Sequence, residues 1–410
     1  MKFNGLLSIM LLCASFTVRA EDVGFSVNDM VYEGAIRFKD GVYGVSRLGF
    51  ANGAIAVDTE RSSVFIVGHE QHQAIAEYEM PGFSKSMIVQ DLPMAVNVQP
   101  YTTIFDKVTD DNTDKLNTIT GLNLIDGRLV VNVAQYYDGD GGNTDTTIVI
   151  AEPRQIADSS IAGYIKMDSA VRGSGWLTKI PNPLQNDFGY DYISGYASNL
   201  PINGRNSMGP SAFGINSTNL LSAKADSTIS MEEFLGFSIE NQLHEDHYNE
   251  SGTNDIWTEI ARAHTGIIVP GTNTYAVFGY SGGHEAGIGY KIRGCGGACP
   301  IDAGDVYNHY WFWSLDDLQK VKSGLLQPHQ IRPYEYGRFE LPFELQDEFD
   351  TPRLMSGASY DYENQLLYFT LGRADKSQGR FEYLPILLKY SLKVGQRPNS
   401  PSNASVVITD

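Results

Sequence analysis

The sequence GAIAVDTERSSVFIVG, residues 53–68, begins with a glycine and carries two short apolar segments around a polar turn. This pattern is typical of a β-hairpin, because short apolar runs form strands and a polar cluster forms the turn between them. Four further segments have the same organisation: GLNLIDGRLVVNV (121–133), GPSAFGINSTNLLSA (209–223), GIIVPGTNTYAVFG (266–279) and GASYDYENQLLYFT (357–370). They recur at intervals of roughly 55 to 90 residues. Repeated hairpins of this kind predict an all-β fold of the β-propeller class.

The five hairpins set a minimum for the number of blades. The long intervals leave room for two further blades, so we predict seven, with five as the alternative. The composition agrees with strands and turns, since the chain contains 41 Gly, 23 Tyr and 19 Phe. The segment LDDLQKVKS, residues 315–323, predicts a short helix. Residues 404–408 (ASVVI) predict a last strand that pairs with the N-terminal blade and closes the ring.

The first twenty of the 410 residues have the pattern of an export signal. Lys2 precedes an apolar stretch too short to span a bilayer, and Val18, Arg19 and Ala20 form a suitable cleavage site. We therefore expect residues 1–20 to be a signal peptide and residues 21–410 to be one β-propeller domain. No later segment is apolar enough for a membrane span, which predicts a secreted or periplasmic protein.

The formal net charge of the chain is −19, and it becomes −21 when Lys2 and Arg19 leave with the signal peptide. Such an acidic protein is not expected to bind nucleic acid. An anionic polysaccharide is possible as a substrate only if the protein provides a local basic pocket. The acidity alone indicates solubility, and we expect a monomer with no membrane partner.

In a propeller, the starts of the innermost strands gather around one axis. The polar residues close to the repeat glycines are Asn123, Arg205, Asn206, Ser207, Arg262, His264, Arg353 and Ser356. Arginine grips carboxylate or sulfate with two parallel hydrogen bonds, and histidine and tyrosine are suitable proton carriers. Tyr190, Tyr192 and Tyr196 add phenols and faces on which sugars can stack. The plain alternative is that Arg205 forms a structural salt bridge and His264 is a satisfied histidine at a strand end.

Cys295 and Cys299 are the cysteines that remain after the expected cleavage. In an exported protein they can form a disulfide, but His284 and His309 flank them and complete a ligand set for a closed structural zinc site. We expect zinc, with the disulfide as the alternative. Residues 138–145 (DGDGGNTD) could hold calcium, although an Asp/Gly hairpin turn explains them as well.

Four stretches carry a resemblance to a known family: GYDYISGYASNLP, GRNSMGPSAF, IIVPGTNTYAVFGYSGGHEAG and YWFWSLDDLQKVKSG. They resemble exported bacterial β-propellers, among them the seven-bladed ulvan lyases of marine bacteria. The resemblance extends from about Gly41 to Leu392. Ulvan lyases cleave an anionic algal polysaccharide at a uronic acid by β-elimination.

The resemblance implies an arginine that neutralises the uronate carboxylate and histidine or tyrosine residues that act as base and acid. Arg205 fits the first role, and Tyr190 or Tyr192 fits the phenol. The family's histidine appears here as Asn123, which can hydrogen-bond a carboxylate but cannot carry a proton at neutral pH. His264 could take that task by its strand position. The paired cysteines and flanking histidines of the family favour zinc.

The sequence therefore predicts a secreted polysaccharide lyase that acts on a uronate-containing, sulfated, ulvan-like glycan. The predicted catalytic residues are Arg205, Tyr190, His264 and Asn123, and the predicted substrate-binding residues are Tyr192, Tyr196, Ser207 and Arg262. The alternative is a propeller that binds carbohydrate or serves as a scaffold without catalysis. A glycoside hydrolase is disfavoured, because the repeats do not bring two carboxylates together.

Overall fold

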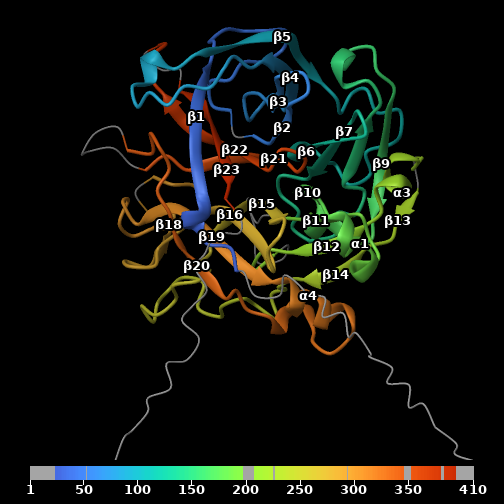
Figure 1. Ribbon diagram of the computed structural model, residues 1–410, viewed down its shortest axis with the longest axis vertical. Helices are drawn as coiled ribbons and strands as arrows, with labels where there is room; N and C mark the ends of the chain where they lie inside the picture. The colour runs from blue at the N-terminus through green and yellow to red at the C-terminus, as the bar shows by residue number, and fades with distance from the viewer. Residues whose placement is uncertain are drawn as a thin grey trace, which may run out of the picture.

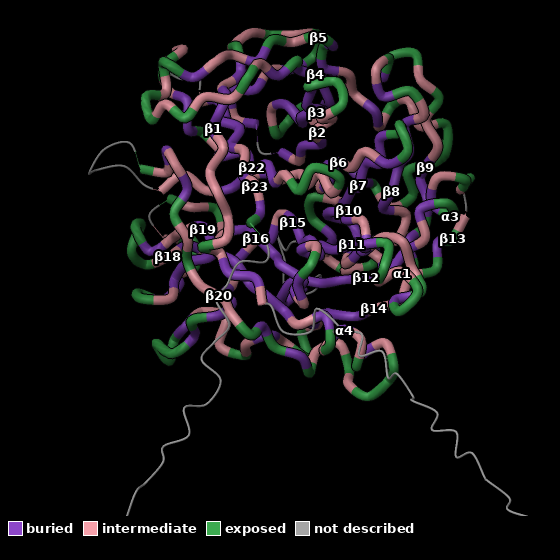
Figure 2. The backbone as a smooth tube through the Cα atoms, in the orientation of Figure 1, coloured by how far each residue is buried: buried purple, intermediate pink, exposed green. Residues whose placement is uncertain are grey.

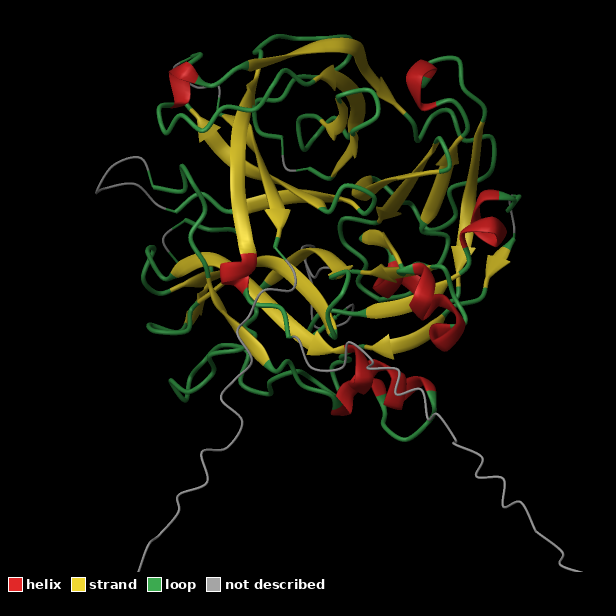
Figure 3. Cartoon of the chain, viewed as in Figure 1, coloured by secondary structure: helices red, strands yellow, loops and turns green. Residues whose placement is uncertain are grey.

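The computed structural model describes residues 24–51, 53–196, 207–224, 227–292, 294–345, 352–379 and 383–393. Within these ranges, strands dominate and the helices are short and peripheral (Figures 1 and 3). The strands form sheet units that surround a common centre, so the protein is all-β and propeller-like. No helix of the described ranges is long and apolar enough to cross a membrane.

The described strands form five sheet units, which we number by the chain order of their innermost strands. Unit 1 contains β2 (Ile55–Asp58), β3 (Ser63–Val67), β4 (Ala74–Glu79) and β5 (Met94–Thr103). Unit 2 contains β6 (Thr118–Ile125), β7 (Arg128–Ala134), β8 (Thr147–Ile150), β9 (Ile161–Met167) and the short β13 (Thr228–Ile229). Unit 3 contains β10 (Trp176–Lys179), β11 (Tyr192–Gly195), β12 (Ala212–Ile215) and β14 (Glu232–Leu235).

Units 4 and 5 complete the arrangement. Unit 4 contains β15 (Arg262–Ile268), β16 (Thr274–Gly282), β19 (Val306–Ser314) and β20 (Glu335–Arg338). Unit 5 contains β21 (Met355–Asp361), β22 (Leu366–Asp375), β23 (Leu384–Leu392) and β1 (Met30–Phe38). The strands within each unit are antiparallel, except that β13 runs parallel to β9. A short parallel pairing of β1 with β5 joins units 5 and 1 at their outer edges.

The innermost strands form a closed ring of neighbours. β2 contacts β6, β6 contacts β10, β10 contacts β15, β15 contacts β21, and β21 contacts β2. Two repeat glycines explain why this ring is so tight. A Cβ atom at Gly121 would clash with the carbonyl of Gly175, and one at Gly357 would clash with the carbonyl of Gly53. Glycine is therefore required at these points because the backbones of neighbouring units approach each other directly.

The first strand of the chain completes the last unit. β1 pairs antiparallel with β23, from Met30 opposite Leu392 to Arg37 opposite Ile386. Pairing of the two ends of the chain removes the exposed edges that an open array would carry. The strand expected at residues 404–408 lies outside the described residues.

The expectation of seven blades is not supported. The strands in the described ranges form five units, and these strands leave no further four-stranded sheet for a sixth or seventh blade. The long intervals in the sequence are instead occupied by connections and by the outer strands of the same five units.

One of the five repeat segments lies elsewhere than expected. The segment that begins at Gly209 forms β12, which is the third strand of unit 3 and not its innermost strand. The innermost strand is β10, and helix α1 (Asn182–Phe188) stands between it and β11. Because a helix replaces the tight turn, the sequence around β10 lacks the hairpin signal.

The core consists of apolar layers between neighbouring units rather than one central mass. Each layer takes buried side chains from two adjacent sheets: Trp176 and Trp311 lie between units 3 and 4, for example, and Phe278 and Leu388 lie between units 4 and 5. Three further layers pack the remaining neighbours together. Figure 2 shows the buried residues along the sheets and the exposed ones in the outer loops.

The remaining elements lie outside the ring of sheets. Helix α4 (Leu315–Lys322) buries Leu318 and Val321, which confirms the helix expected at residues 315–323. The other short elements are α3 (Ser217–Leu221), the hairpin of β17 (Ile288–Tyr290) and β18 (Ala298–Pro300), and 3₁₀ turns at Val27–Asp29, Val89–Asp91, Pro153–Gln155, Ala170–Gly173 and Pro328–Gln330.

Candidate functional site

A cavity of about 600 Å³ lies along the axis of the ring. Residues of all five innermost strands line it, together with turns that follow β2, β6 and β21. A cavity of this size, with polar groups among apolar ones, is typical of a small-molecule or sugar site. We distinguish two regions of it: the inner region at His264, Thr265, Gly121, Gly175 and Ser356, and the acidic mouth formed by residues 58–61, 126–127, 152–154, 178–179, 192 and 360–364.

His264 brings an available imidazole into the inner region. It lies on β15 at a β-bulge between Ala263 and Thr265, and its ring centroid is 5.7 Å from that of Tyr280. Its Nε2 atom is buried and has no hydrogen-bond partner among the described residues. Burial lowers the pKa of His264 to about 4, and the positive charge of Arg262 adds to this shift. The ring is therefore neutral at neutral pH and can accept a proton.

Arg262 and Tyr196 are within electrostatic reach of each other near the same end of β15, although neither lines the cavity. Arg262 donates hydrogen bonds from Nη1 to the carbonyl oxygens of Glu259 (3.2 Å) and Ala261 (2.7 Å). The Tyr196 hydroxyl is buried and has no hydrogen-bond partner in the part of the chain that is described. Burial raises the pKa of Tyr196, while the charge of Arg262 lowers it, so the phenol stays protonated.

Glu259 adds a carboxylate to this group of residues. Burial raises the pKa of Glu259, and the charges of Arg262 and His247 oppose that effect. Its Oε2 atom lies 3.7 Å from Nδ1 of His247. Arg262 thus influences the protonation of a carboxyl, an imidazole and a phenol at once.

Asn123 lines the cavity, but both ends of its amide are engaged within the protein. Its Oδ1 atom accepts a hydrogen bond from the backbone N–H of Leu177 at 2.8 Å, and its Nδ2 atom donates to Oδ1 of Asn132 at 3.2 Å. The first bond ties β6 to β10, and the second ties it to β7. The side chain therefore has a structural task that explains its presence at this position.

The three tyrosines of the segment around β11 lie in different environments. Tyr192 lines the cavity at the acidic mouth, and burial, with Asp126, Asp191 and Glu363 nearby, raises its pKa to about 12. Tyr190 does not line the cavity. Its ring packs edge-on against Phe234, with the Lys322 ammonium 5.2 Å from its centroid. Tyr192 begins β11, and Tyr196 follows its last residue, so the two tyrosines lie at opposite ends of this strand.

Ser207 is buried, and its hydroxyl donates a hydrogen bond to the carbonyl of Gly209. It precedes β12, so it does not stand at the start of an innermost strand. Arg205, the predicted partner of the uronate carboxylate, lies outside the described residues.

Some of the charged side chains at the acidic mouth form ion pairs with one another. Arg154 lies 2.5 Å from Oδ2 of Asp58 and 3.2 Å from Oε1 of Glu77, and Lys179 lies 2.7 Å from Oε1 of Glu363. The described residues that line the whole cavity include six carboxylates (Asp58, Glu60, Asp126, Glu152, Asp361 and Glu363) and three cations (Arg61, Arg154 and Lys179). The mouth therefore has an excess of negative charge.

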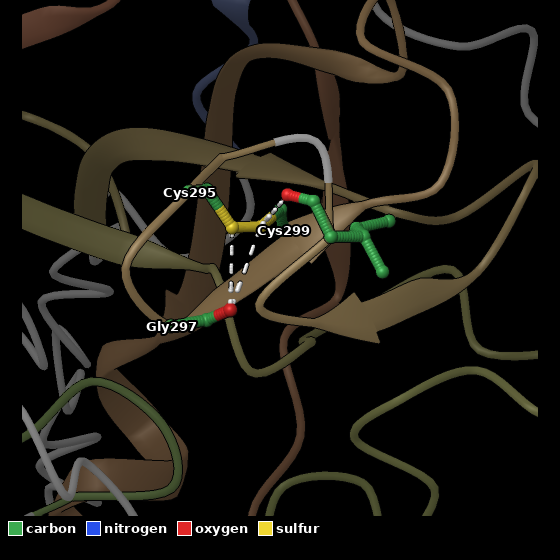
Figure 4. Close-up of a disulfide and its surroundings, with 4 residues drawn as sticks. Cys295, Gly297 and Cys299 are labelled. Atoms are coloured by element: carbon green, nitrogen blue, oxygen red, sulfur yellow. Dashed lines mark hydrogen bonds between the residues drawn. A yellow bond between two sulfur atoms is a disulfide. The ribbon is translucent and has the colours of Figure 1, made fainter.

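The expected zinc site is wrong. Cys295 and Cys299 form a disulfide, with the Gly297 carbonyl oxygen 3.2 Å and 3.4 Å from the two sulfurs (Figure 4). A disulfide removes the thiolates that zinc would need. Both ring nitrogens of His284 are also engaged, with Ser281 Oγ at 2.8 Å and the Asn254 carbonyl oxygen at 2.6 Å.

His309, the last predicted zinc ligand, and residues 138–145, the calcium candidate, also have structural explanations. His309 is buried and packs against Trp311 with the two rings tilted and their centroids 4.5 Å apart. In residues 138–145, the Asp138 carboxylate accepts hydrogen bonds from the backbone of Gly142 and Asn143, which explains the turn without an ion. No group of three or more His, Cys, Asp or Glu side chains in the described ranges is arranged to hold a metal.

The sequence did not single out β10, which contributes Trp176 and Thr178 to the cavity. A signal was present in Gly175 directly before Trp176, because Gly53 likewise comes shortly before the innermost strand β2. Thr178 is 4 % exposed, and its Oγ1 atom has no hydrogen-bond partner in the described portion of the protein. Tyr360, which also lines the cavity, has a buried hydroxyl in the same condition.

Comparisons with known proteins give weak similarities. No family model matches the chain, and no curated protein sequence matches it. Among solved structures, a protein of the GH130 family of mannoside phosphorylases, which contains glycoside hydrolases targeting β-1,2 mannosidic linkages in Candida mannan, has 9 % identity and a TM-score of 0.40, over 88 % of this chain and 95 % of that one.

Two further structures have similar values. An α-L-arabinanase mutant of Cellvibrio cellulosa has 10 % identity and a TM-score of 0.39, over 85 % of this chain and 91 % of the other. A GH62 hydrolase in complex with xylotriose has 9 % identity and a TM-score of 0.36, over 87 % and 96 % of the two chains. These similarities do not assign the chain to a family.

Proposed function

We propose that this protein is an exported, monomeric, five-bladed propeller that processes glycans in its axial cavity. Its reaction is β-elimination at a uronate of a sulfated, ulvan-like polysaccharide. The observation that carries the proposal is His264, a neutral imidazole on a residue that lines the cavity, with an arginine close enough to lower its pKa. A base, a cation and a protonated phenol are the groups that this elimination requires.

In the proposed reaction, His264 removes the C5 proton of the uronate through Nε2. The electron pair moves to form the C4–C5 double bond, and the C4–O bond of the glycosidic linkage breaks. Tyr192, which lines the cavity and whose pKa burial raises to about 12, donates a proton to the leaving oxygen. Arg205, the arginine that the sequence predicts as the partner of the carboxylate, stabilises the negative charge that develops there, an electrostatic contribution worth several kcal/mol.

This assignment changes two roles that the sequence suggested. Of the two phenols that the sequence offered as the acid, Tyr192 is kept and Tyr190 is not, because Tyr190 packs against Phe234 and does not line the cavity. Asn123 is removed from the catalytic set, since its amide is bonded to Leu177 of β10 and Asn132 of β7. The disulfide between Cys295 and Cys299 is compatible with an exported protein.

The second candidate is a propeller that binds glycans without catalysis. It is favoured by the internal pairing of the polar groups at the mouth, where Arg154, Asp58 and Lys179 all have partners within the protein. Incubation with ulvan and other uronate polymers separates the two functions. Elimination produces an unsaturated uronate that absorbs ultraviolet light, whereas binding and hydrolysis do not. Binding without any rise in absorbance would leave the second candidate.

A further inference from the structure

The acidic mouth of the axial cavity has a feature that the proposed reaction does not use. Thr178 is almost completely buried on β10, lines the cavity and has an Oγ1 atom without a hydrogen-bond partner among the described residues. A buried hydroxyl of this kind normally finds a partner, because leaving it unpaired costs about 1–3 kcal/mol. The unpaired Tyr360 hydroxyl lies on the same cavity wall. The two hydroxyls therefore point to a ligand that offers hydrogen bonds.

The charges around these hydroxyls restrict the ligand. Arg154 and Lys179 are already engaged with Asp58, Glu77 and Glu363, so they are not free to neutralise an incoming anion. Among the described lining residues, this leaves one cation outside any ion pair, Arg61, against four carboxylates: Glu60, Asp126, Glu152 and Asp361. Asp126 and Glu60, in contrast, are exposed at the rim and belong to no ion pair of the described residues. A carboxylate or sulfate that enters this mouth meets like charges, which is unfavourable in a partly desolvated site.

We propose that the acidic mouth is a subsite for an uncharged sugar unit, which Thr178 and Tyr360 bind through sugar hydroxyls and from which the rim carboxylates exclude anionic units. The inference rests on the proposed glycan substrate. The glycan would then bind in one direction, with its uronate near His264 and Arg262 and the adjacent uncharged sugar unit at the mouth. Specificity then arises from repulsion as well as attraction.

The experiment is isothermal calorimetry of the full-length protein at low salt. The probes are a small panel of neutral trisaccharides, such as cellotriose, each measured beside its C6-carboxylated counterpart. Thr178→Val removes the hydroxyl with little change of shape, and Thr178→Ser restores it as the matched control. We expect Thr178→Val to weaken the best neutral ligand about five- to tenfold, while Thr178→Ser stays close to the parent protein.

The charge component has its own variants. Asp126→Asn and Glu60→Gln should tighten binding of the carboxylated trisaccharides severalfold without affecting the neutral ones, and added salt should reduce this difference. Three results would overturn the inference: no neutral trisaccharide binds, Thr178→Val binds the neutral ligand as tightly as the parent protein, or the carboxylated ligands are indifferent to Asp126→Asn. Calorimetry requires no turnover, so absence of elimination would refute the proposed reaction while leaving this subsite intact.

Discussion

The axial cavity and the disulfide hairpin region both present histidines that the sequence marked for chemistry, but they treat them differently. His264 lines the cavity, whereas His284 binds Ser281 and Asn254 with its two ring nitrogens. His309 is buried beside Trp311 in the second region, and its Nδ1 atom, like Nε2 of His264, has no hydrogen-bond partner among the described residues. The comparison teaches that a place on the cavity lining, and not an unpartnered ring nitrogen or a position near a repeat, distinguishes the candidate reactive histidine from the structural ones.

Replacement of the cavity histidine should have the largest effect. We expect His264→Gln to lower kcat for elimination by about 10²- to 10⁴-fold, because a general base contributes that much and glutamine cannot accept the proton. Initial rates of product absorbance measure the change. The matched control is His284→Gln, which should lower the melting temperature through its lost bonds while kcat stays within a small factor. If His264→Gln retained the parental kcat, the contrast between the two regions would have no catalytic meaning.

The dependence of stability on acid pH provides a second test of His264. Burial places the pKa of folded His264 at about 4, below the value near 6.5 of an unfolded chain, so the unfolded state binds protons first. The stability that depends on its neutral ring is complete above pH of about 6.5 and is lost as the pH falls toward about 4. Between these two pH values, we expect the free energy of unfolding of His264→Gln to fall by about 1–3 kcal/mol less than that of the parent protein. Chemical denaturation of both proteins across this range provides the measurement.

The second region contributes to the same acid limb. Burial also lowers the pKa of His284 and of His309, so the parent protein should keep a residual slope after His264 is replaced. Burial raises the pKa of Glu259, which acts in the opposite direction. Identical pH profiles for the parent and His264→Gln proteins would show that His264 titrates normally.

Removal of the disulfide should have a smaller effect, confined to stability. The bond closes a loop with a sequence separation of 4, so the double variant Cys295→Ser/Cys299→Ser should lose about 2 kcal/mol or less. Thermal unfolding with and without a reductant measures it. Because the hairpin of β17 and β18 supplies no residue to the cavity, elimination should continue at the parental rate at temperatures where the variant is folded.

The smallest effect is expected at the acidic mouth. Lys179→Met removes an ion pair with Glu363, whose side chain is 72 % exposed, and exposed pairs contribute about 0.5 kcal/mol or less. Equilibrium denaturation should place the variant within that margin of the parent. A much larger loss in the free energy of unfolding would mean that ion pairs at the mouth stabilise the fold, so that the mouth would have a structural role like the disulfide hairpin region.

Much of the fold could be predicted from the glycine-led hairpins, since β2, β6, β15 and β21 are innermost strands as their pattern indicated. The segment at Gly209 could not be placed, because a third strand and an innermost strand bury the same kind of residues. The expected blade count failed for a related reason: outer strands such as β14 and β20 have short, partly exposed sequences that resemble loops.

The candidate site was predicted less completely. Strand position alone predicted His264 and Arg262 near the axis; His264 lines the cavity, whereas Arg262 does not, and the roles of both stay predictions. The predicted zinc ligands do lie near one another in part, as the stacked rings of His284 and His309 show, but spacing does not report whether two cysteines are oxidised. Thr178 was missed because its significance lies in an absent partner, which only the folded structure reveals.

The pairing of β1 with β23 has a consequence for how the protein is made. Met30 leaves the ribosome early, but its partner Leu392 is synthesised last among the described strands. At about 5–20 residues per second, β1 waits on the order of tens of seconds before its neighbour exists. The edge of β1 that faces β23 therefore stays unpaired until late in translation, although β5 can pair with β1 earlier, and the ring can close only after synthesis has reached β23. Loss of either end should yield a chain that aggregates rather than a smaller, active fragment.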